Sequence, residues 1–216
     1  MEISHIGHSC FRLKGKDLTI VIDPYDPKIG YKLPRLSANV LLTTHFHYDH
    51  HNIDGIKDYE LLIEYPGEYE TKNIFIYGLP TFHDHKQGAE RGKNTIYLVE
   101  INGFSILHLG DLGHELQQTT LEKIGNVDVL MIPVGGTYTI DAEVAAKVIS
   151  SIEPGIVIPM HYKTDDLTGI SDLAGLDKFM DEMGMENNIK KMETLKLTSH
   201  NDIPQETEIV ILNQAH

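Results

Sequence analysis

The chain has 216 residues and a net charge of −14, with 18 basic and 32 acidic side chains. Its 41% hydrophobic content is typical of a globular protein and argues against disorder. An acidic surface repels phosphate backbones, so we do not expect nucleic acid as a partner. The single cysteine, Cys10, excludes an intrachain disulfide and is expected to be a small buried residue.

The first residues lack a basic region followed by an apolar stretch, and no apolar run approaches the length of a membrane span. We therefore expect a cytoplasmic protein with no membrane partner. A homo-oligomer is compatible with the sequence.

The first half of the chain is rich in predicted strands. A loop over 24–39 follows Asp23-Pro24, because prolines cannot continue a sheet. A short helix is expected at 52–57, and Asn102-Gly103 is the strongest hairpin signal. The expected strands are 2–6, 9–14, 18–22, 40–43, 60–63, 74–78, 95–101 and 104–109.

The second half alternates strands with helices. Helices are predicted at 116–124, 141–152 and 171–184, and strands at 127–134, 156–159, 192–197 and 209–212. Thr139 or Asp141 can cap the second helix. We find no repeat or linker and expect one domain over 1–216. The predicted fold class is α+β, with helices outside two packed sheets.

Five potential metal ligands directly follow the buried strand at 40–43: His45, His47, Asp49, His50 and His51. Side chains alternate along an extended segment, so His45 and His47 can bind one ion from the same side. Asp49 and His50 follow where the chain turns and can face a second ion. The alternative is a solvated loop without metal, but a hydrophobic strand leading into alternating histidines favours a metal site.

Three more predicted strand ends carry histidine or aspartate: 81–85, with His83 and His85; 108–114, with Asp111 and His114; and 158–162, with His161. Metal sites in sheet proteins are assembled from such loops.

With these motifs the sequence resembles the metallo-β-lactamase-fold hydrolase superfamily. His45-x-His47-x-Asp49-His50 matches its metal-binding signature, and His83, Asp111 and His161 follow in the expected order. The chain is most similar to small stand-alone hydrolases related to ascorbate-6-phosphate lactonases. It differs from antibiotic-hydrolysing lactamases, whose second site uses cysteine, and from flavodiiron proteins, which have a carboxylate at the position of His47. The resemblance implies an αββα sandwich.

The resemblance also implies a ligand set. His45, His47 and His83 would hold the first ion, Asp49, His50 and His161 the second, and Asp111 would bridge both. A hydroxide between two divalent ions would attack the substrate, while Asp49 orients it or takes its proton. Zinc is the expected metal, with manganese or iron as alternatives.

Several roles stay open at this stage. His85 is an alternative to His83, which we favour because it is nearer the strand end and Asp84 could orient it. His114 is either a substrate-facing acid or a surface residue. His8 and Asp23 could support the ligands or be ordinary turn residues, and His51 could face solvent. The candidates for substrate contact are His114, Arg91, Lys93, Tyr138 and Lys163, and a cation facing the metals would imply an anionic substrate.

The leading hypothesis is a binuclear metal-dependent hydrolase of a small ester, lactone or phosphodiester. A nuclease is the alternative within enzymes, and the acidic balance counts against it. A non-catalytic metal-binding protein is the third hypothesis, and it predicts metals closed by protein ligands with no cleft.

Overall fold

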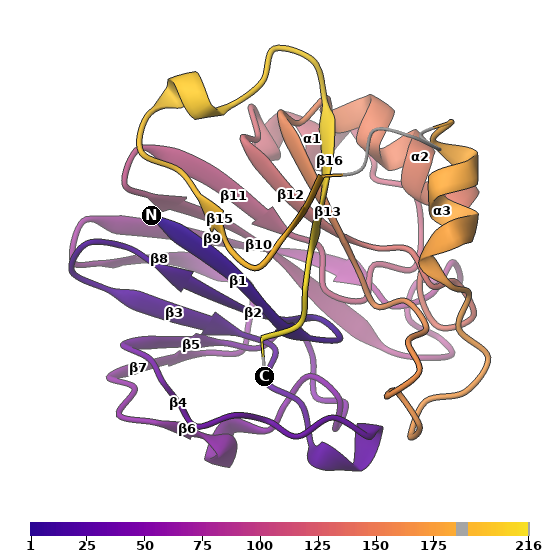
Figure 1. Cartoon of the computed structure of the whole chain (residues 1–216), viewed down its shortest axis with the longest axis horizontal. Coiled ribbons are helices and arrows are strands. Elements are labelled where there is room, and N and C mark those ends of the chain that lie inside the picture. Colours follow the sequence, from indigo (N-terminus) through magenta and orange to yellow (C-terminus); the bar gives the residue numbers. More distant parts are fainter. Residues whose placement is uncertain (185–189, 216) are drawn as a thin grey trace.

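Two β-sheets pack face to face in the computed structural model, which describes residues 1–184 and 190–215 (Figure 1). One sheet has the strand order β15-β1-β2-β3-β5-β7 and the other β14-β16-β13-β12-β11-β10-β9-β8. The first sheet contains β1 (Glu2–Gly7), β2 (Cys10–Lys14), β3 (Thr19–Ile22), β5 (Val40–Leu42), β7 (Leu61–Ile63) and β15 (Leu195–Lys196). The second contains β8 (Gly67–Thr71), β9 (Ile74–Phe82), β10 (Lys93–Ile101), β11 (Phe104–His108), β12 (Val129–Pro133), β13 (Ile156–Met160), β14 (Lys190–Met192) and β16 (Glu208–Leu212).

The central strands, such as β3, β5, β12 and β13, are apolar on both faces because the sheets are covered on both sides there. In β3, Ile20 and Ile22 enter the core between the sheets, whereas Val21 points to the outer face. In β12, Met131 enters the same central core and Leu130 the outer one. This alternation explains why β12 reads as a continuous apolar run rather than as an amphipathic strand.

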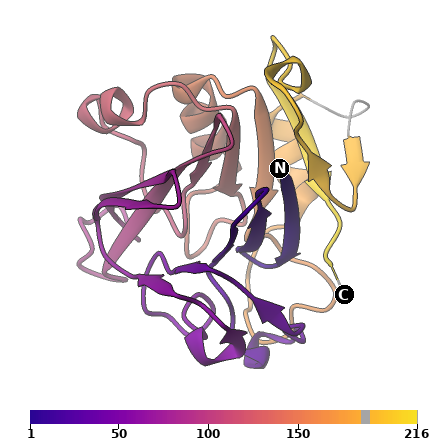
Figure 2. The ribbon, with the colours of Figure 1, turned by 90° about the vertical axis from the view of Figure 1, so that its left-hand side faces the viewer.

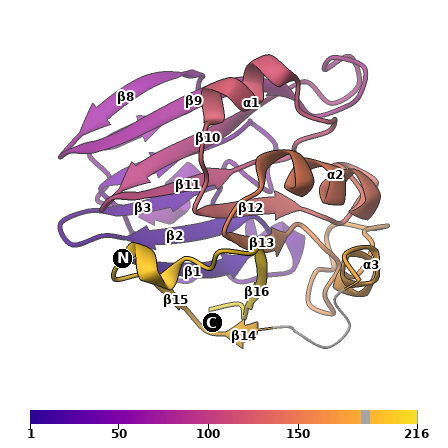
Figure 3. The same cartoon turned by 90° about the horizontal axis from the view of Figure 1, so that it is seen from above.

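Three α-helices cover the outer face of the second sheet: α1 (Gln118–Ile124), α2 (Ala142–Ile152) and α3 (Leu176–Glu182). Val148 of α2 and Phe179 of α3 are buried there against strand residues such as Ile132. Seen from above, the helices follow one another across this sheet (Figure 3). Asp141 caps α2, since its Oδ1 accepts a hydrogen bond from the Val144 N–H at 3.0 Å.

The outer face of the first sheet is covered differently. Figure 2 shows the early part of the chain, in indigo and purple, on the side away from the helices. Residues 24–39, two short 3₁₀ helices (Pro27–Ile29 and Ile53–Gly55) and the two-stranded pair β4 (Leu36–Ser37) and β6 (Ile56–Lys57) pack there. The α+β prediction is confirmed, and in the described residues the α-helices lie on one sheet. Three prolines between 24 and 34 explain why the other face has none.

Some boundaries differ from the predictions. The strand β8 was not predicted, and the helix expected at 171–184 begins only at Leu176. Residues 171–175 are instead held against the β12–α2 loop, where the Ala174 N–H donates to the Gly135 carbonyl at 2.8 Å. The segment expected as a helix at 52–57 is a single 3₁₀ turn followed by β6. A third 3₁₀ turn, His200–Asp202, precedes β16.

The strand directions bring the predicted ligands together. In the first sheet β1, β3 and β5 run the same way, because β1–β2 and β2–β3 are antiparallel and β3–β5 is parallel. By the same reasoning β9, β11, β12 and β13 share one direction in the second sheet. Every histidine or aspartate that directly follows one of these strands therefore emerges at the carboxyl edge of its sheet. None of the described helices has the length and apolar character needed to cross a membrane.

Candidate metal centre

The segment after β5 is fixed by Asp23, which directly follows β3. One carboxylate oxygen of Asp23 accepts the Thr44 N–H at 2.7 Å, and the other accepts a hydrogen bond from His50 Nδ1 at 2.7 Å. The hydroxyl of Thr44 also lies 3.0 Å from His45 Nδ1. Asp23 therefore holds the His50 ring so that its Nε2 atom faces Asp111, as supporting groups do in metal sites.

A first group of possible ligands contains His45, His47 and His83, whose nearest ring nitrogens lie within 4.8 Å of one another. His83 is buried at the end of β9, whereas His85 is exposed and lines a neighbouring cavity. The structure thus brings His83, and not His85, to the other two histidines. His47 is the exposed member of the group.

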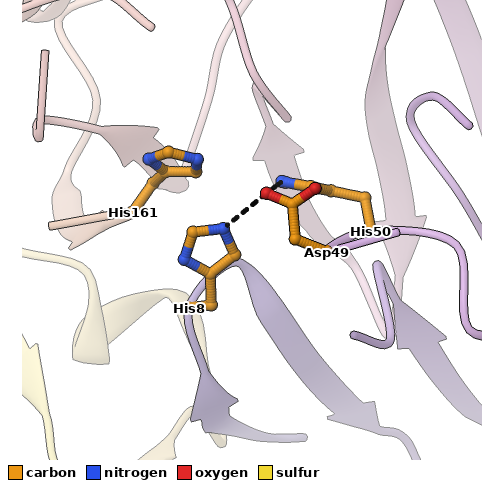
Figure 4. Close-up of side chains that lie close together, drawn as sticks. All are labelled: His8, Asp49, His50 and His161. Carbon is orange, nitrogen blue, oxygen red and sulfur yellow. Dashed lines mark hydrogen bonds and ion pairs between the residues drawn. The ribbon is translucent and has the colours of Figure 1, made fainter. Parts of the chain in front are cut away.

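A second group contains Asp49, His50 and His161, and it also includes His8 (Figure 4). The four side chains come from the β1–β2 turn, the loop after β5 and the end of β13, and they point toward one another. His8 Nε2 lies 3.3 Å from an oxygen of Asp49. The His161 N–H donates to the His8 carbonyl at 3.2 Å, so the two sheets are joined at this point.

Asp111 lies between the two groups. One oxygen is 3.1 Å from His83 Nε2 and 3.3 Å from His161 Nε2, and the other is 3.1 Å from His50 Nε2. Asn94 holds the Asp111 backbone, because its side-chain oxygen accepts the Asp111 N–H at 3.0 Å. Among the predicted ligands, Asp111 has the central position expected of a bridging carboxylate.

Unsatisfied buried atoms show that these residues fit a metal. The Nε2 atoms of His45, His50 and His161 are buried without a hydrogen-bond partner of good geometry, as is one oxygen of Asp111. Such atoms are costly unless something binds them. Burial tends to raise the pKa of Asp111, but the nearby histidines, His161 first, outweigh it and keep the pKa well below its ordinary value. Imidazole nitrogens around an ionised carboxylate suit zinc, manganese or iron.

The backbone is strained at three of these positions. His8, Asp23 and His161 have φ values of 54°, 50° and 53°, a region that residues with a Cβ rarely adopt. Burial and the neighbouring His161 lower the pKa of His8 to about 4, so its ring is neutral at pH 7. Strain and buried polar groups concentrated at one place are typical of a functional site.

A cavity of about 520 Å³ opens onto the centre. Four predicted ligands line it, together with Arg91 and Tyr138, two of the predicted substrate contacts. The remaining lining residues come from the segment after β5 and from residues 169–171. The full lining is Phe46, His47, Tyr48, Asp49, His83, Arg91, Asp111, Tyr138, Gly169, Ile170 and Ser171. This volume suits a small molecule.

Other predicted residues lie elsewhere. His114 is not part of this lining, and both of its ring nitrogens are in hydrogen bonds, with the Phe82 N–H and the Glu115 carbonyl. Lys163 and Lys93 are exposed and are likewise absent from the lining. His51 pairs with Glu64 at 2.6 Å. These four side chains therefore do not reach the cavity in this structure.

Sequence reasoning missed part of the support. Asp84 was expected to orient His83, but this is wrong because its carboxylate instead accepts four backbone N–H groups from residues 86–91. The role of Asn94 was not foreseen, since an asparagine inside a strand carries no local signal. His8 could have been included from the rule used for the ligands, because it directly follows a strand.

The fold and site together define a metal-binding α+β protein of the metallo-β-lactamase type. A family model described as "Beta-lactamase superfamily domain" matches residues 2–161, and the chain belongs to this superfamily. It is 28% identical over 195 residues to a protein of Natranaerobius thermophilus named "UPF0173 metal-dependent hydrolase", covering 80% of this chain and 88% of that one. A relative with the same description in Thermococcus kodakarensis is 28% identical over 193 residues, covering 76% of this chain and 85% of that one.

A solved structure extends the likeness over nearly the whole chain. It comes from Thermotoga maritima and is described provisionally as a zinc-dependent hydrolase of the metallo-β-lactamase superfamily. The two chains are 35% identical, with a TM-score of 0.78, and the match covers 98% of this chain and 97% of the other. The predicted superfamily and its fold are therefore confirmed.

Proposed function

We propose that this protein is a hydrolase that holds two divalent ions, with zinc first and manganese or iron as alternatives, and cleaves a small ester, lactone or phosphodiester. The position of Asp111 carries the proposal, because its two oxygens lie within 3.8 Å of nitrogens from four histidines, which come from three different loops. His45, His47 and His83 would hold one ion, Asp49, His50 and His161 the other, and Asp111 both.

Ions held by these residues would supply an ionised water near neutral pH and would polarise the substrate oxygen. The chain's own residues position the reactants. Asp49 lines the cavity and has a carboxylate that can orient the attacking water or accept its proton. Burial raises the pKa of Asp49, but His50 and the His8 hydrogen bond outweigh it and lower the pKa below its ordinary value, so Asp49 is ionised at pH 7.

The cavity also favours a catalytic metal site over a purely structural one. A structural site is closed by its protein ligands, whereas His47, Asp49, His83 and Asp111 all face the cavity. The strongly acidic chain, at −14, gives no support to a nuclease.

Replacement of Asp111 by alanine tests the proposal. We expect D111A to lose metal and hydrolysis together, measured by metal analysis and by assays with a lactone, a thioester and a chromogenic bis-phosphodiester. D54A is the control, because Asp54 is exposed on a 3₁₀ helix outside the cavity lining. A D111A protein that keeps both properties would contradict the proposal.

A further inference from the structure

The cavity over the centre contains one basic side chain, Arg91, among its described lining residues. The other charged side chains there, apart from histidines, are Asp49 and Asp111, which belong to the proposed centre. The chain as a whole is acidic, with a net charge of −14, so a basic side chain in the lining of this cavity needs a specific explanation.

The backbone of Arg91 is held in place by Asp84. The buried carboxylate of Asp84 accepts the Arg91 N–H at 2.8 Å, and the N–H groups of Lys86, Gly88 and Glu90 at 2.8–3.0 Å. The His83 N–H also donates to the Gly92 carbonyl at 3.1 Å, which closes the loop onto the end of β9. The loop that carries Arg91 is therefore fixed directly beside a proposed ligand.

The guanidinium itself has few partners. Its carbon lies 5.6 Å from the centre of the Tyr138 ring, and its side chain is 32% exposed. The one carboxylate in ion-pair range within the described chain is Glu90, at 3.9 Å, and Glu90 is also paired with Lys86 at 2.5 Å. No hydrogen bond from the guanidinium to another described residue is present, so its N–H donors remain available.

The wall that carries Tyr138 is also built with strain. Thr137 is β-branched and has a φ of 56°, which is an outlier for such a residue. Its hydroxyl donates to the Asp172 carbonyl at 2.6 Å, which joins this loop to the segment before α3. Tyr138, whose ring lies beside the Arg91 guanidinium, therefore directly follows a residue that the fold holds in an unfavourable backbone conformation.

Part of the cavity lining is apolar. Phe46 is 55% exposed and Tyr48 is 48% exposed, and Ile170 lies in the same lining. Tyr48 also donates to the Gly169 carbonyl at 3.3 Å, which links the two walls. The cavity therefore combines the proposed metal centre, one cation with free N–H donors and several apolar lining residues.

We propose that the substrate carries a carboxylate or phosphate group, separate from the bond that is cleaved, and that Arg91 binds this anion while the apolar part of the substrate lies against Phe46 and Ile170. This inference rests on the proposed function. Arginine binds both anions through two parallel N–H donors, which a flexible lysine does not reproduce. Arg91 thereby determines which esters are accepted.

Matched esters test this substrate class in the metal-loaded protein. The anionic probes are mono-4-nitrophenyl glutarate for a carboxylate and 4-nitrophenyl 4-phosphonobutanoate for a phosphate-like group. The neutral probe is 4-nitrophenyl pentanoate, which has the chain length of the glutarate ester. Each rate is corrected for hydrolysis without enzyme. We expect kcat/KM to be about tenfold higher for at least one anionic ester.

The variant is R91Q and the matched control is K93Q, which makes the same charge change two residues away at an exposed position outside the lining. R91Q should remove the preference for the anionic ester, mainly by raising KM, and change the neutral ester by less than about twofold. K93Q should behave as the wild type. Equal kcat/KM for all three esters in the wild type, or an unchanged preference in R91Q, would overturn the proposal.

Calorimetric titration with glutarate separates this inference from the proposed function. We expect R91Q to bind glutarate about tenfold more weakly than the wild type and K93Q. If neither these esters nor the lactone, the thioester and the bis-phosphodiester are hydrolysed, the hydrolase proposal fails, and the calorimetry still decides the anion site. Equal glutarate affinities of R91Q and K93Q would then reject it.

Discussion

Single residues that are not themselves predicted ligands determine the shape of the centre. Asp23 holds His50 and the backbone of Thr44, and Asn94 holds the backbone of Asp111. His8, in the turn between β1 and β2, contacts the carboxylate of Asp49. Residues of this kind fix the orientation of the groups that bind metal, and their loss typically weakens metal binding by about 10- to 100-fold.

We predict that H8N weakens the second metal site selectively. Asparagine tolerates the positive φ of position 8 but is too short to replace the histidine beside Asp49. Metal analysis after dialysis against graded chelator should show one ion retained and the other lost at about 10- to 100-fold lower chelator than in the wild type. H51N is the control, since His51 pairs with Glu64 instead. Equal loss of both ions would contradict a local role.

At the residue scale, the sequence indicated which histidines and aspartates lie together better than it indicated the residues that support them. The seven predicted ligands lie close together because they follow strands that run in one direction within each sheet. Asp84 was misassigned because proximity in sequence to His83 suggested a contact, whereas its carboxylate is used by the backbone N–H groups of its own loop. Contacts such as Asn94 with Asp111 depend on strand register, which local patterns do not contain.

At the scale of elements, the loop between β9 and β10 is organised by one carboxylate. Burial alone would raise the pKa of Asp84, but its backbone N–H donors outweigh burial and lower the pKa to about 2. The carboxylate is therefore ionised throughout the neutral pH range. The ionised form accepts the hydrogen bonds of the loop most strongly.

We predict that D84N loosens this loop without removing metal. An amide cannot accept four N–H donors as well as a carboxylate does, so Arg91 would lose its fixed position. The KM for an anionic ester should rise by about tenfold, while the metal content stays at the wild-type level. Steady-state kinetics and metal analysis measure the two effects. D141N, at the cap of α2, is a matched control whose KM should not change.

Element predictions succeeded where the signal was local and failed where tertiary contacts decide. The Asn102-Gly103 hairpin and the cap at Asp141 follow from local chemistry and are confirmed. Residues 171–175 have a helix-like apolar pattern, but their hydrogen bond to Gly135 and the positive φ of Asp172 keep them out of α3. The strand β8, with alternating half-buried side chains, is stabilised mainly by pairing with β9.

On the scale of the molecule, the centre lies where the two sheets meet. The first sheet and its loops supply His8 and the ligands between 45 and 50, and the second supplies His83, Asp111 and His161. Several buried polar atoms there have no partner in the described protein. Ions bound at the proposed centre would therefore contribute to the stability of the fold as well as to the chemistry.

We predict that removal of metal lowers the melting temperature. Free ion at about 100 times Kd stabilises the folded state by about 2.7 kcal/mol, which corresponds to roughly 5–10 °C for a chain of this size. Differential scanning calorimetry with and without chelator measures the shift. D111A should melt at the same temperature in both conditions, and a wild-type protein indifferent to chelator would contradict the prediction.

The hairpin between β8 and β9 has a further consequence. Lys72 and Asn73 form its tip with φ values of 48° and 62°, and both are exposed. The chain before this tip carries His8 and the ligands between 45 and 50, and the chain after it carries the other three. Cleavage there would give two polypeptides that each hold an incomplete set of ligands, so that added zinc would favour their reassembly. This division makes the protein a natural scaffold for a split reporter controlled by metal.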